Sequence, residues 1–495
     1  MRSPLRSFAL LSLLLAALLP SNASGALKLG VAEDAAKGMD DGGAAMFQQM
    51  RGVGMSVIRM SVFWDETRPT EITERAALDR AMPQARGKGV QVILSIVPLH
   101  GNGVTQTPNG YDLFARFCLL VAQRYPYVRD FIIGNEPNQP RFWRPQYDAS
   151  GKRVGPATYL YALIRARDTL KAYDPTLHVI GVGLSPRGND DAKATSNAST
   201  SPVMFIHDLG VAYRASARNA PFVDDVNFHP YPNPQSAADP PTKGLQWPNA
   251  GAPNLDRLQQ AWWDAFHGTA QPTFQESGAR ASSSSASAGG FVQWVFDESG
   301  WQTYTSNLAA YTGSENTQTV DENTQAQYYA ELIGRYSCDP RVQMLLFFHW
   351  IDESDRDRLQ TGLVRADGTF KPAYAIVRSA LDAGCATGQV QWAHTTGVLG
   401  ASVSWKSSPA GAFTVKAEEN FSYTANVVSP LNGSSKGWAT PVGSVRGDGN
   451  AYWSVPVKFR GVPLKRGRLY QYTVTLRSTT NPERTTVLTG KPFRR

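Results

Sequence analysis

The chain has 495 residues, too many for one ordinary hydrophobic core, so two domains are expected. Its composition, with 42% hydrophobic and 18% charged residues and many aromatic side chains, is that of a globular protein and excludes a disordered chain. The net charge of +8 is unevenly spread, because residues 386–495 hold 14 Lys and Arg against 4 Asp and Glu, whereas residues 26–385 carry −4.

The first residues have the pattern of a secretory signal peptide. Arg2 and Arg6 precede an apolar run over residues 8–19, and small residues follow it. The run is too short to span a bilayer, and no later segment approaches its length. We therefore expect residues 1–25 to be removed and the protein to be exported without a transmembrane segment. A non-cleaved anchor is the alternative.

Eight short apolar runs alternate with amphipathic stretches over residues 26–385. In chain order they are LKLGVAE, MSVIRMSVFW, VQVILSIVPLH, VRDFIIGNE, LHVIGVGLSP, VDDVNFHPY, GGFVQWVFDESGW and VQMLLFFHW. Between most of them apolar residues recur at helical spacing, and a last helix is expected near residues 373–383. This alternation predicts an α/β fold, a (β/α)8 TIM barrel. An open doubly wound sheet is the alternative, but no GxGxxG motif follows a first strand.

Two insertions and a change of period mark the rest of the chain. Residues 185–202 are polar, and residues 279–290 have low complexity and are expected to form a flexible surface loop. From residue 386 onward apolar and polar residues alternate, which predicts a small C-terminal β-sandwich of seven or eight short strands. Pro456 indicates an edge strand. Trp405 and Trp453 occupy alternating positions that are typical of a core.

The three cysteines are scattered and do not form a metal-binding motif. Cys118 shares a helical face with Phe114, Phe117 and Val121, so it is expected in the core. Two others, Cys338 and Cys385, each follow a predicted helix. In an exported protein they are expected to form a disulfide on the lower side of the barrel.

The carboxyl ends of barrel strands are where active sites of this fold lie. The apolar runs end there in polar and aromatic side chains, among them Arg59, His100, Asn135, Glu136, His229, Tyr231, Glu298 and Trp350. Two carboxylates across a barrel mouth can hydrolyse an acetal, since one protonates the leaving oxygen and the other attacks the anomeric carbon or activates water. Glu136 and Glu298 are the predicted pair.

Glu276 is the alternative partner of Glu136, because FQESG and FDESG are alike. Glu298 ends a clear strand, FVQWVF, whereas Glu276 has no strand before it and no helix after it. Asp297 is expected to point away from Glu298, because side chains alternate along a strand.

The motifs resemble clan A of the glycoside hydrolases, the retaining barrels that include families 5 and 39. The stretch GNEPNQPRFW is similar to family 39, and VIRMSVFW and DESGWQT are similar to family 5. The resemblance covers roughly residues 27–380 and implies that Glu136 is the acid/base and Glu298 the nucleophile. It further implies that Asn135 donates to the sugar 2-hydroxyl, that Arg59 and Tyr231 hold Glu298, that His100 and His229 bind hydroxyls or orient Glu136, and that Trp350 forms the floor of the subsite.

The resulting hypothesis is a secreted, cellulase-like retaining β-glycosidase with a carbohydrate substrate. We expect no cofactor and no metal, since two carboxylates carry the reaction, and no nucleic-acid partner. Glucan, mannan, xyloside and acidic exopolysaccharide all fit the motifs. The basic domain is expected either to be a solvated surface or to bind an anionic cell-wall or extracellular polymer. A non-catalytic carbohydrate-binding wall protein and a transglycosylase with the same residues are the alternative functions.

Overall fold

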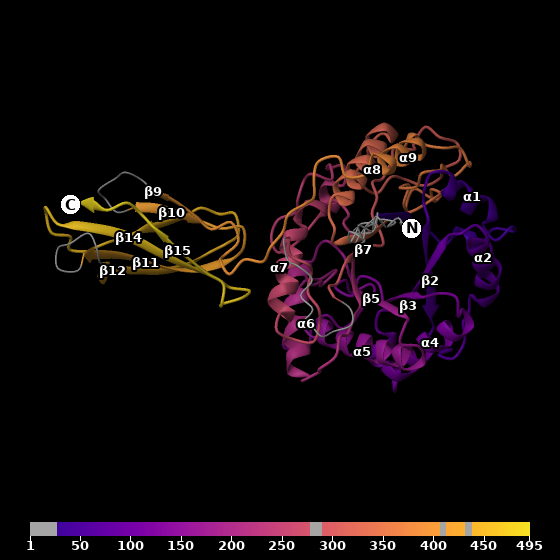
Figure 1. Ribbon diagram of the computed structural model, residues 1–495, viewed down its shortest axis with the longest axis horizontal. Coiled ribbons are helices and arrows are strands. Elements are labelled where there is room, and N and C mark those ends of the chain that lie inside the picture. Colours follow the sequence, from indigo (N-terminus) through magenta and orange to yellow (C-terminus); the bar gives the residue numbers. More distant parts are fainter. Residues whose placement is uncertain (1–26, 278–289, 406–411, 431–437) are drawn as a thin grey trace, which may run out of the picture.

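A computed structural model describes residues 27–277, 290–405, 412–430 and 438–495. The expected signal peptide and nearly all of the low-complexity insertion lie outside these ranges. The described chain forms a barrel and, C-terminal to it, a separate pair of antiparallel sheets (Figure 1). Among the helices in these ranges, none is long and apolar enough to cross a bilayer.

Eight parallel strands close the barrel in sequence order. They are β1 (Lys28–Ala32), β2 (Val57–Trp64), β3 (Gln91–Pro98), β4 (Asp130–Ile133), β5 (His178–Leu184), β6 (Asp225–Phe228), β7 (Trp294–Phe296) and β8 (Val342–Phe347). The first strand pairs with both β2 and β8, which completes the ring. The predicted barrel is therefore confirmed, and the open sheet is rejected.

Helices lie around the outside of the strand ring (Figure 1). They are α1 (Ala44–Gly52), α2 (Arg75–Gly87), α3 (Gly103–Gln106), α4 (Gly110–Arg124), α5 (Gly155–Tyr173), α6 (Pro202–Ala215), α7 (Leu255–Phe266), α8 (Glu322–Ser337) and α9 (Pro372–Ala383). These crossovers return the chain to the amino-terminal side, so that successive strands run parallel. All carboxyl ends of the strands consequently meet at one mouth.

The buried apolar side chains of the barrel form two clusters. Seven strand residues form a cluster of their own, and each is at most 1% exposed: Val57, Ile93, Ile132, Ile180, Val295, Met344 and Leu346. A larger cluster includes the predicted face of α4, where Phe114, Phe117, Cys118 and Val121 are buried as expected. This close packing holds the strands in fixed positions, and with them the side chains at their ends.

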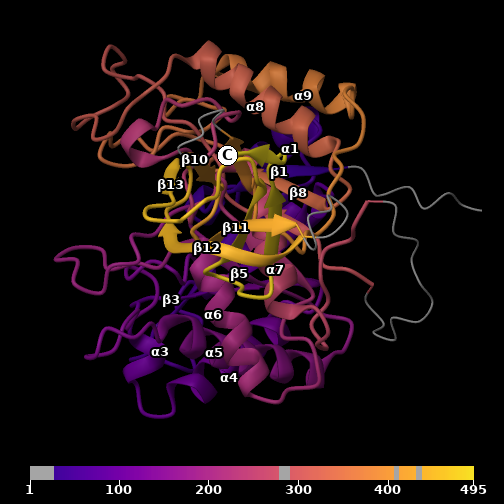
Figure 2. The ribbon, with the colours of Figure 1, turned by 90° about the vertical axis from the view of Figure 1, so that its left-hand side faces the viewer.

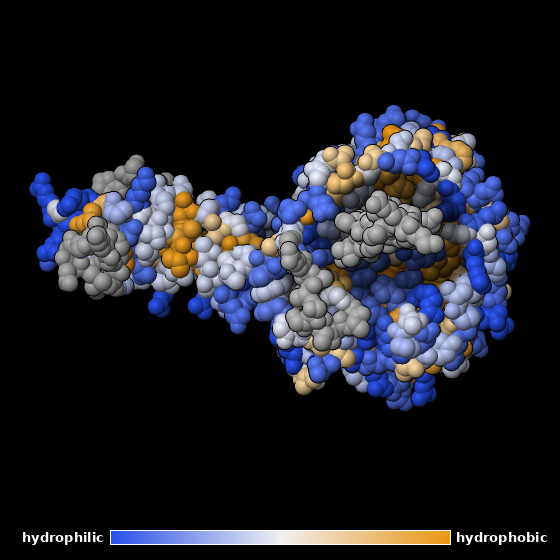
Figure 3. All heavy atoms as spheres, viewed as in Figure 1, coloured by the Kyte–Doolittle hydropathy of each residue, from blue (hydrophilic) through white to orange (hydrophobic). Residues whose placement is uncertain are grey.

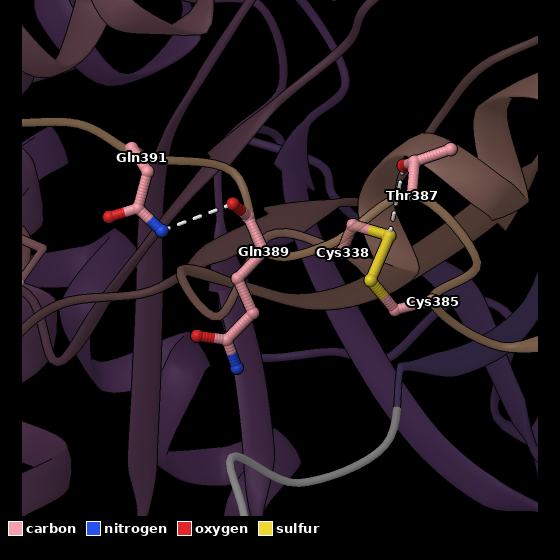
Figure 4. Close-up of a disulfide and its surroundings, with 5 residues drawn as sticks. All are labelled: Cys338, Cys385, Thr387, Gln389 and Gln391. Atoms are coloured by element: carbon pink, nitrogen blue, oxygen red, sulfur yellow. Dashed lines mark hydrogen bonds between the residues drawn. A yellow bond between two sulfur atoms is a disulfide. The ribbon is translucent and has the colours of Figure 1, made fainter.

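The predicted disulfide joins the ends of two neighbouring helices (Figure 4). Cys338 follows α8 and Cys385 follows α9, with their Cα atoms 4.6 Å apart and the two residues 47 positions apart in the sequence. Sγ of Cys338 also lies 3.5 Å from Oγ1 of Thr387 (Figure 4). The bond is confirmed and attaches the start of the interdomain segment to the barrel.

The C-terminal domain consists of two antiparallel sheets (Figure 2). One has the order β13–β10–β9, and the other has the order β12–β11–β14–β15 with β16 beside β14. The strands are β9 (Ser402–Trp405), β10 (Ala412–Lys416), β11 (Phe421–Pro430), β12 (Trp438–Gly449), β13 (Val455–Lys458), β14 (Leu469–Ser478), β15 (Thr485–Thr489) and β16 (Phe493–Arg494). Phe413, Val457 and Val474 are among the residues buried in one apolar core. Pro456 lies in β13, an edge strand as predicted.

The two tryptophans expected in this core are not buried in it. Trp453 is 70% exposed and Trp405 is 36% exposed. The first precedes β13 in a turn, where its N–H donates to the carbonyl of Asn450, so the alternation of the strand does not extend to it. The second lies at the end of β9. Both belong to the exposed apolar residues of this domain, which shows an apolar band among hydrophilic residues in Figure 3.

The C-terminal domain lies on the side of the barrel where α7 is found (Figure 1), and polar and stacking contacts join the two. Arg484 donates to Asp264 at 2.9 Å and also pairs with the buried carboxylate of Glu419. Trp263 of α7 stacks on His394 with a ring separation of 3.9 Å. The sheets are thus fixed beside a barrel helix.

Candidate active site

Six of the eight predicted site residues meet at the mouth of the barrel. They are Arg59 within β2, Asn135 and Glu136 after β4, His229 and Tyr231 after β6, and Glu298 after β7. They are distant in the sequence, but closure of the parallel barrel brings these strand ends to one side.

Arg59 is the central cation of this group and is only 5% exposed. Its Nη1 donates to Oε1 of Glu298 at 2.7 Å, and its Nη2 donates to Oδ1 of Asn135 at 2.8 Å and to Oγ of Ser95 at 3.0 Å. Its Nε lies 3.4 Å from Oδ2 of Asp297. Burial opposes its charge, but the two carboxylates outweigh burial and raise the pKa of Arg59 above its ordinary value.

Both oxygens of Glu298 are held by neighbours. Arg59 occupies Oε1, and the hydroxyl of Tyr231 donates to Oε2 at 3.1 Å. Burial, followed by the charges of Glu298 and Glu136, raises the pKa of Tyr231 well above its ordinary value, so the phenol keeps its proton and remains a donor. The carboxylate therefore has a fixed position and orientation.

His229 lies between the two predicted catalytic carboxylates and is fully buried. Its Nδ1 is 3.0 Å from Oε1 of Glu136 and 3.6 Å from Oε2 of Glu298, and its Nε2 is 3.2 Å from Oδ1 of Asp297. Burial alone would lower its pKa, but the charges of Glu298, Asp297 and Glu136 raise the pKa of His229 well above the ordinary value. The three surrounding carboxylates therefore favour the charged form of the imidazole.

The backbone turns sharply where β4 delivers its two polar residues. Gly134 has φ 86°, and Glu136 has φ 35°, in the left-handed region that non-glycine residues rarely adopt. A Cβ on Gly134 would meet the ring of Tyr159 at 3.0 Å, so this glycine is also required by space. Strain of this kind is often found at functional sites.

Asp297 was expected to point away from Glu298, and this expectation is wrong. Its side chain is fully buried beside Arg59 and His229, and it accepts from Nδ2 of Asn227 at 3.0 Å. Burial would raise its pKa, but the charges of His229 and Arg59 outweigh burial and lower the pKa of Asp297. The regular alternation fails because β7 ends at Phe296. The sequence did contain a signal for this role, because two acidic residues, Asp297 and Glu298, directly follow a predicted strand.

His100 and Trp350 form no hydrogen bond, ion pair or ring contact with the other six residues. The imidazole of His100 is 58% exposed and lies 2.8 Å from Oε1 of Glu66. Trp350 is 2% exposed, and its ring packs against Tyr374 with centroids 5.9 Å apart. A buried ring offers little surface to a sugar, so its role as a subsite floor stays a prediction that this placement does not favour. Phe348 instead lies near Tyr231, with ring centroids 6.5 Å apart.

Glu276, the alternative partner of Glu136, lies elsewhere. Its carboxylate contacts Nδ1 of His394 in the segment that leads to the C-terminal domain. The placement therefore favours Glu298 over Glu276 as the partner of Glu136.

A cavity of about 250 Å³ opens beside Glu136. Its walls include Glu136, Tyr231 and Arg187, together with Gln302 and Thr361 from the loops after β7 and β8. Within the described ranges, no three His, Cys, Asp or Glu side chains are grouped so that they could hold a metal ion.

No family model and no curated protein matches this chain. Solved structures that match include a family 39 glycoside hydrolase from Bacteroides cellulosilyticus WH2, with TM-score 0.47 and 16% identity over 88% of this chain and 81% of that chain. A family 5 enzyme, GH5_18 from Streptomyces cattleya in complex with GlcNAc, has TM-score 0.48 and 16% identity over 76% and 84%. A GH39 β-xylosidase from Caulobacter crescentus has TM-score 0.44 and 14% identity over 82% and 83%. Similarities of this size do not define an activity, so the function is inferred from the side chains.

Proposed function

We propose that this chain is an exported retaining β-glycosidase that hydrolyses β-linked oligo- or polysaccharides through Glu136 and Glu298. The supporting observation is that both carboxylates contact one imidazole nitrogen, Nδ1 of His229. Distances of 3.0 and 3.6 Å from that atom limit the separation of Glu136 Oε1 and Glu298 Oε2 to about 6.6 Å, and retaining enzymes place their carboxyls roughly 5 Å apart.

In the first step Glu298 attacks the anomeric carbon and the bond to the leaving oxygen breaks. Glu136 transfers its proton to that oxygen, so the leaving group departs as a neutral alcohol. Arg59 and Tyr231 hold the two oxygens of Glu298 in place for the attack. Oε1 of Glu136 is occupied by His229, which leaves Oε2 to carry the transferred proton.

In the second step Glu136, now a carboxylate, takes a proton from water. The resulting hydroxide attacks the anomeric carbon and Glu298 departs, so two inversions give net retention. Asn135 uses Oδ1 to accept from Arg59, and its Nδ2 is therefore oriented away from the arginine and available to a sugar hydroxyl.

Export and a second binding partner form part of the proposal. Arg2, Arg6 and the following apolar run support a cleaved signal peptide. The charge of +10 on residues 386–495, opposite −4 on residues 26–385, supports attachment to an anionic cell-wall or extracellular polymer.

The test is hydrolysis of a panel of aryl β-glycosides and β-glycans, with the anomer of the first product identified by NMR. Retention is expected, Glu298→Gln should have no measurable turnover, and Glu276→Gln is the matched control that should keep its activity. An inverted product, or an inactive Glu276→Gln beside an active Glu298→Gln, would contradict the assignment.

A further inference from the structure

A second, larger cavity adjoins the one beside Glu136. It measures about 700 Å³ and is formed by the β5–α6 loop, residues 185–201, and the β6–α7 loop, residues 229–254. Amides and hydroxyls dominate its walls, including Asn189, Ser199 and Asn233. Arg187 lines both cavities and is therefore their common wall.

Within the described ranges, Arg187 is the charged residue of these walls whose side chain has no hydrogen-bond or ion-pair partner. Of the other three, Glu136 pairs with His229, and Nζ of Lys243 lies 2.9 Å from Oδ1 of Asp239. Among the described residues, no carboxylate lies within ion-pair distance of the Arg187 guanidinium and no acceptor receives a hydrogen bond from it, although the residue is half-buried. A guanidinium keeps its proton and carries five N–H donors, so an acceptor is expected there.

The backbone of Arg187 is tied to the loop that carries Glu136. Its carbonyl accepts from Nδ2 of Asn138 at 3.2 Å and from Nε2 of Gln139 at 2.5 Å. Asn138 is fully buried and also donates to the carbonyls of Ser185 and Thr200. The backbone position of Arg187 relative to Glu136 is thus set by part-buried hydrogen bonds and not by the loop alone.

We propose that Arg187 binds an acidic substituent of the glycan, a carboxylate or a sulfate, next to the bond that Glu136 and Glu298 cleave. The planar guanidinium matches such oxyanions with two parallel hydrogen bonds. Neutral amides and hydroxyls in the larger cavity suit the hydroxyls of an adjoining sugar, because they both donate and accept. The substrate class is therefore an acidic β-linked polysaccharide, an inference that rests on the proposed glycosidase function.

The test compares each acidic polysaccharide with its own carboxyl-reduced, neutral form. Hydrolysis by the full chain is measured for the unmodified protein, Arg187→Gln, Arg187→Lys and Lys193→Gln. Lys193 is the matched control, because it lies exposed in the same loop, carries the same charge and lines neither cavity. A sulfated β-glycan whose sugars carry no carboxylates separates the two possible anions.

The expected result is a KM for the acidic form about ten- to a hundredfold below that for the reduced form, as for other charge-assisted hydrogen bonds. Arg187→Gln should remove this difference, Arg187→Lys should keep part of it, and Lys193→Gln should keep all of it. Preference for the sulfated glycan alone would assign the substituent as sulfate. No preference for either anion, or an equal effect of Arg187→Gln on acidic and neutral forms, would overturn the inference.

Failure of this inference is distinguishable from failure of the proposed function. If aryl glycosides are hydrolysed but Arg187→Gln does not change the KM for any acidic polymer, the acidic subsite is refuted and the proposed glycosidase function stands. If no glycoside is cleaved, affinity electrophoresis of Glu298→Gln with and without Arg187→Gln in gels of acidic and reduced polymer tests the site by binding. Both variants also carry Lys465→Gln, Arg466→Gln and Arg468→Gln, which weakens retention by the basic C-terminal domain. Equal retardation of the two in the acidic gel would then reject the site.

Discussion

Arg59 and Glu298 form a buried ion pair, with Nη1 and Oε1 2.7 Å apart and side chains only 5% and 11% exposed. They are 239 positions apart in the sequence and come from β2 and the end of β7. The position of the predicted nucleophile consequently depends on a cation from the far side of the barrel. Because Arg59 also contacts Asn135, it links the strand that carries the nucleophile to the strand that carries Glu136.

Replacing Arg59 should affect both stability and turnover. Arg59→Met leaves Asp297 and Glu298 buried without this cation, and we expect the free energy of unfolding to fall by about 3–5 kcal/mol. Arg59→Lys keeps the charge but loses the fork geometry, so it should retain more stability while kcat still falls. Urea denaturation and kcat with an aryl glycoside check this. Full stability in Arg59→Met would contradict it.

The raised pKa of His229 predicts a loss of stability at alkaline pH. Since its folded pKa lies above the unfolded value near 6.5, the stabilisation is complete below about pH 6.5 and decreases as pH rises toward the folded pKa. The free energy of unfolding, relative to His229→Asn, should fall by up to about 1.4 kcal/mol per pH unit in that window. Urea titrations from pH 5 to 10 measure it, and a difference that grows with pH would have the wrong sign.

Glu136→Gln should discriminate between leaving groups. The amide cannot donate the proton that a natural sugar leaving group requires, whereas an activated aryl group needs little acid assistance. General acid catalysis contributes about 100- to 10,000-fold, so kcat/KM should fall by that order for a glycan and much less for a dinitrophenyl glycoside. Equal losses on both substrates would argue against Glu136 as the acid/base.

Loss of the Cys338–Cys385 disulfide should destabilise the fold. Closing a loop over 47 positions contributes about 4 kcal/mol in the chain-entropy account, so Cys338→Ser should lower the free energy of unfolding by up to that amount. Burial raises the pKa of the Cys118 thiol, which should react with a thiol reagent only after unfolding. Two reactive thiols in the native, oxidised protein would refute the pairing.

The basic C-terminal domain should bind polyanions in a salt-dependent way. Lys465, Arg466 and Arg468 are exposed near one turn, and charges of this kind are screened within about 8 Å at physiological ionic strength. We expect retardation in gels that contain an anionic polymer at low salt and release at roughly 0.5 M salt. Changing the three to Gln should weaken the retention. Retention on a neutral glycan at high salt would instead point to exposed aromatics such as Trp453.

The sequence alone was sufficient to predict the barrel, the antiparallel C-terminal domain and six residues that meet at the barrel mouth. Local periodicity determines which segments are strands and helices, and in a parallel barrel every strand end faces the same side. Residue type and strand position were therefore enough to bring Glu136 and Glu298 together.

Only the tertiary structure decided where side chains lie once a strand has ended. Asp297 joined the charged cluster because β7 stops one residue earlier, and Trp453 became exposed because it lies in the turn before β13. The unpaired state of Arg187 likewise depends on every neighbour that folding brings to the two cavities. Whether a side chain is buried or paired depends on residues that are distant in the sequence, so no local sequence pattern predicts it.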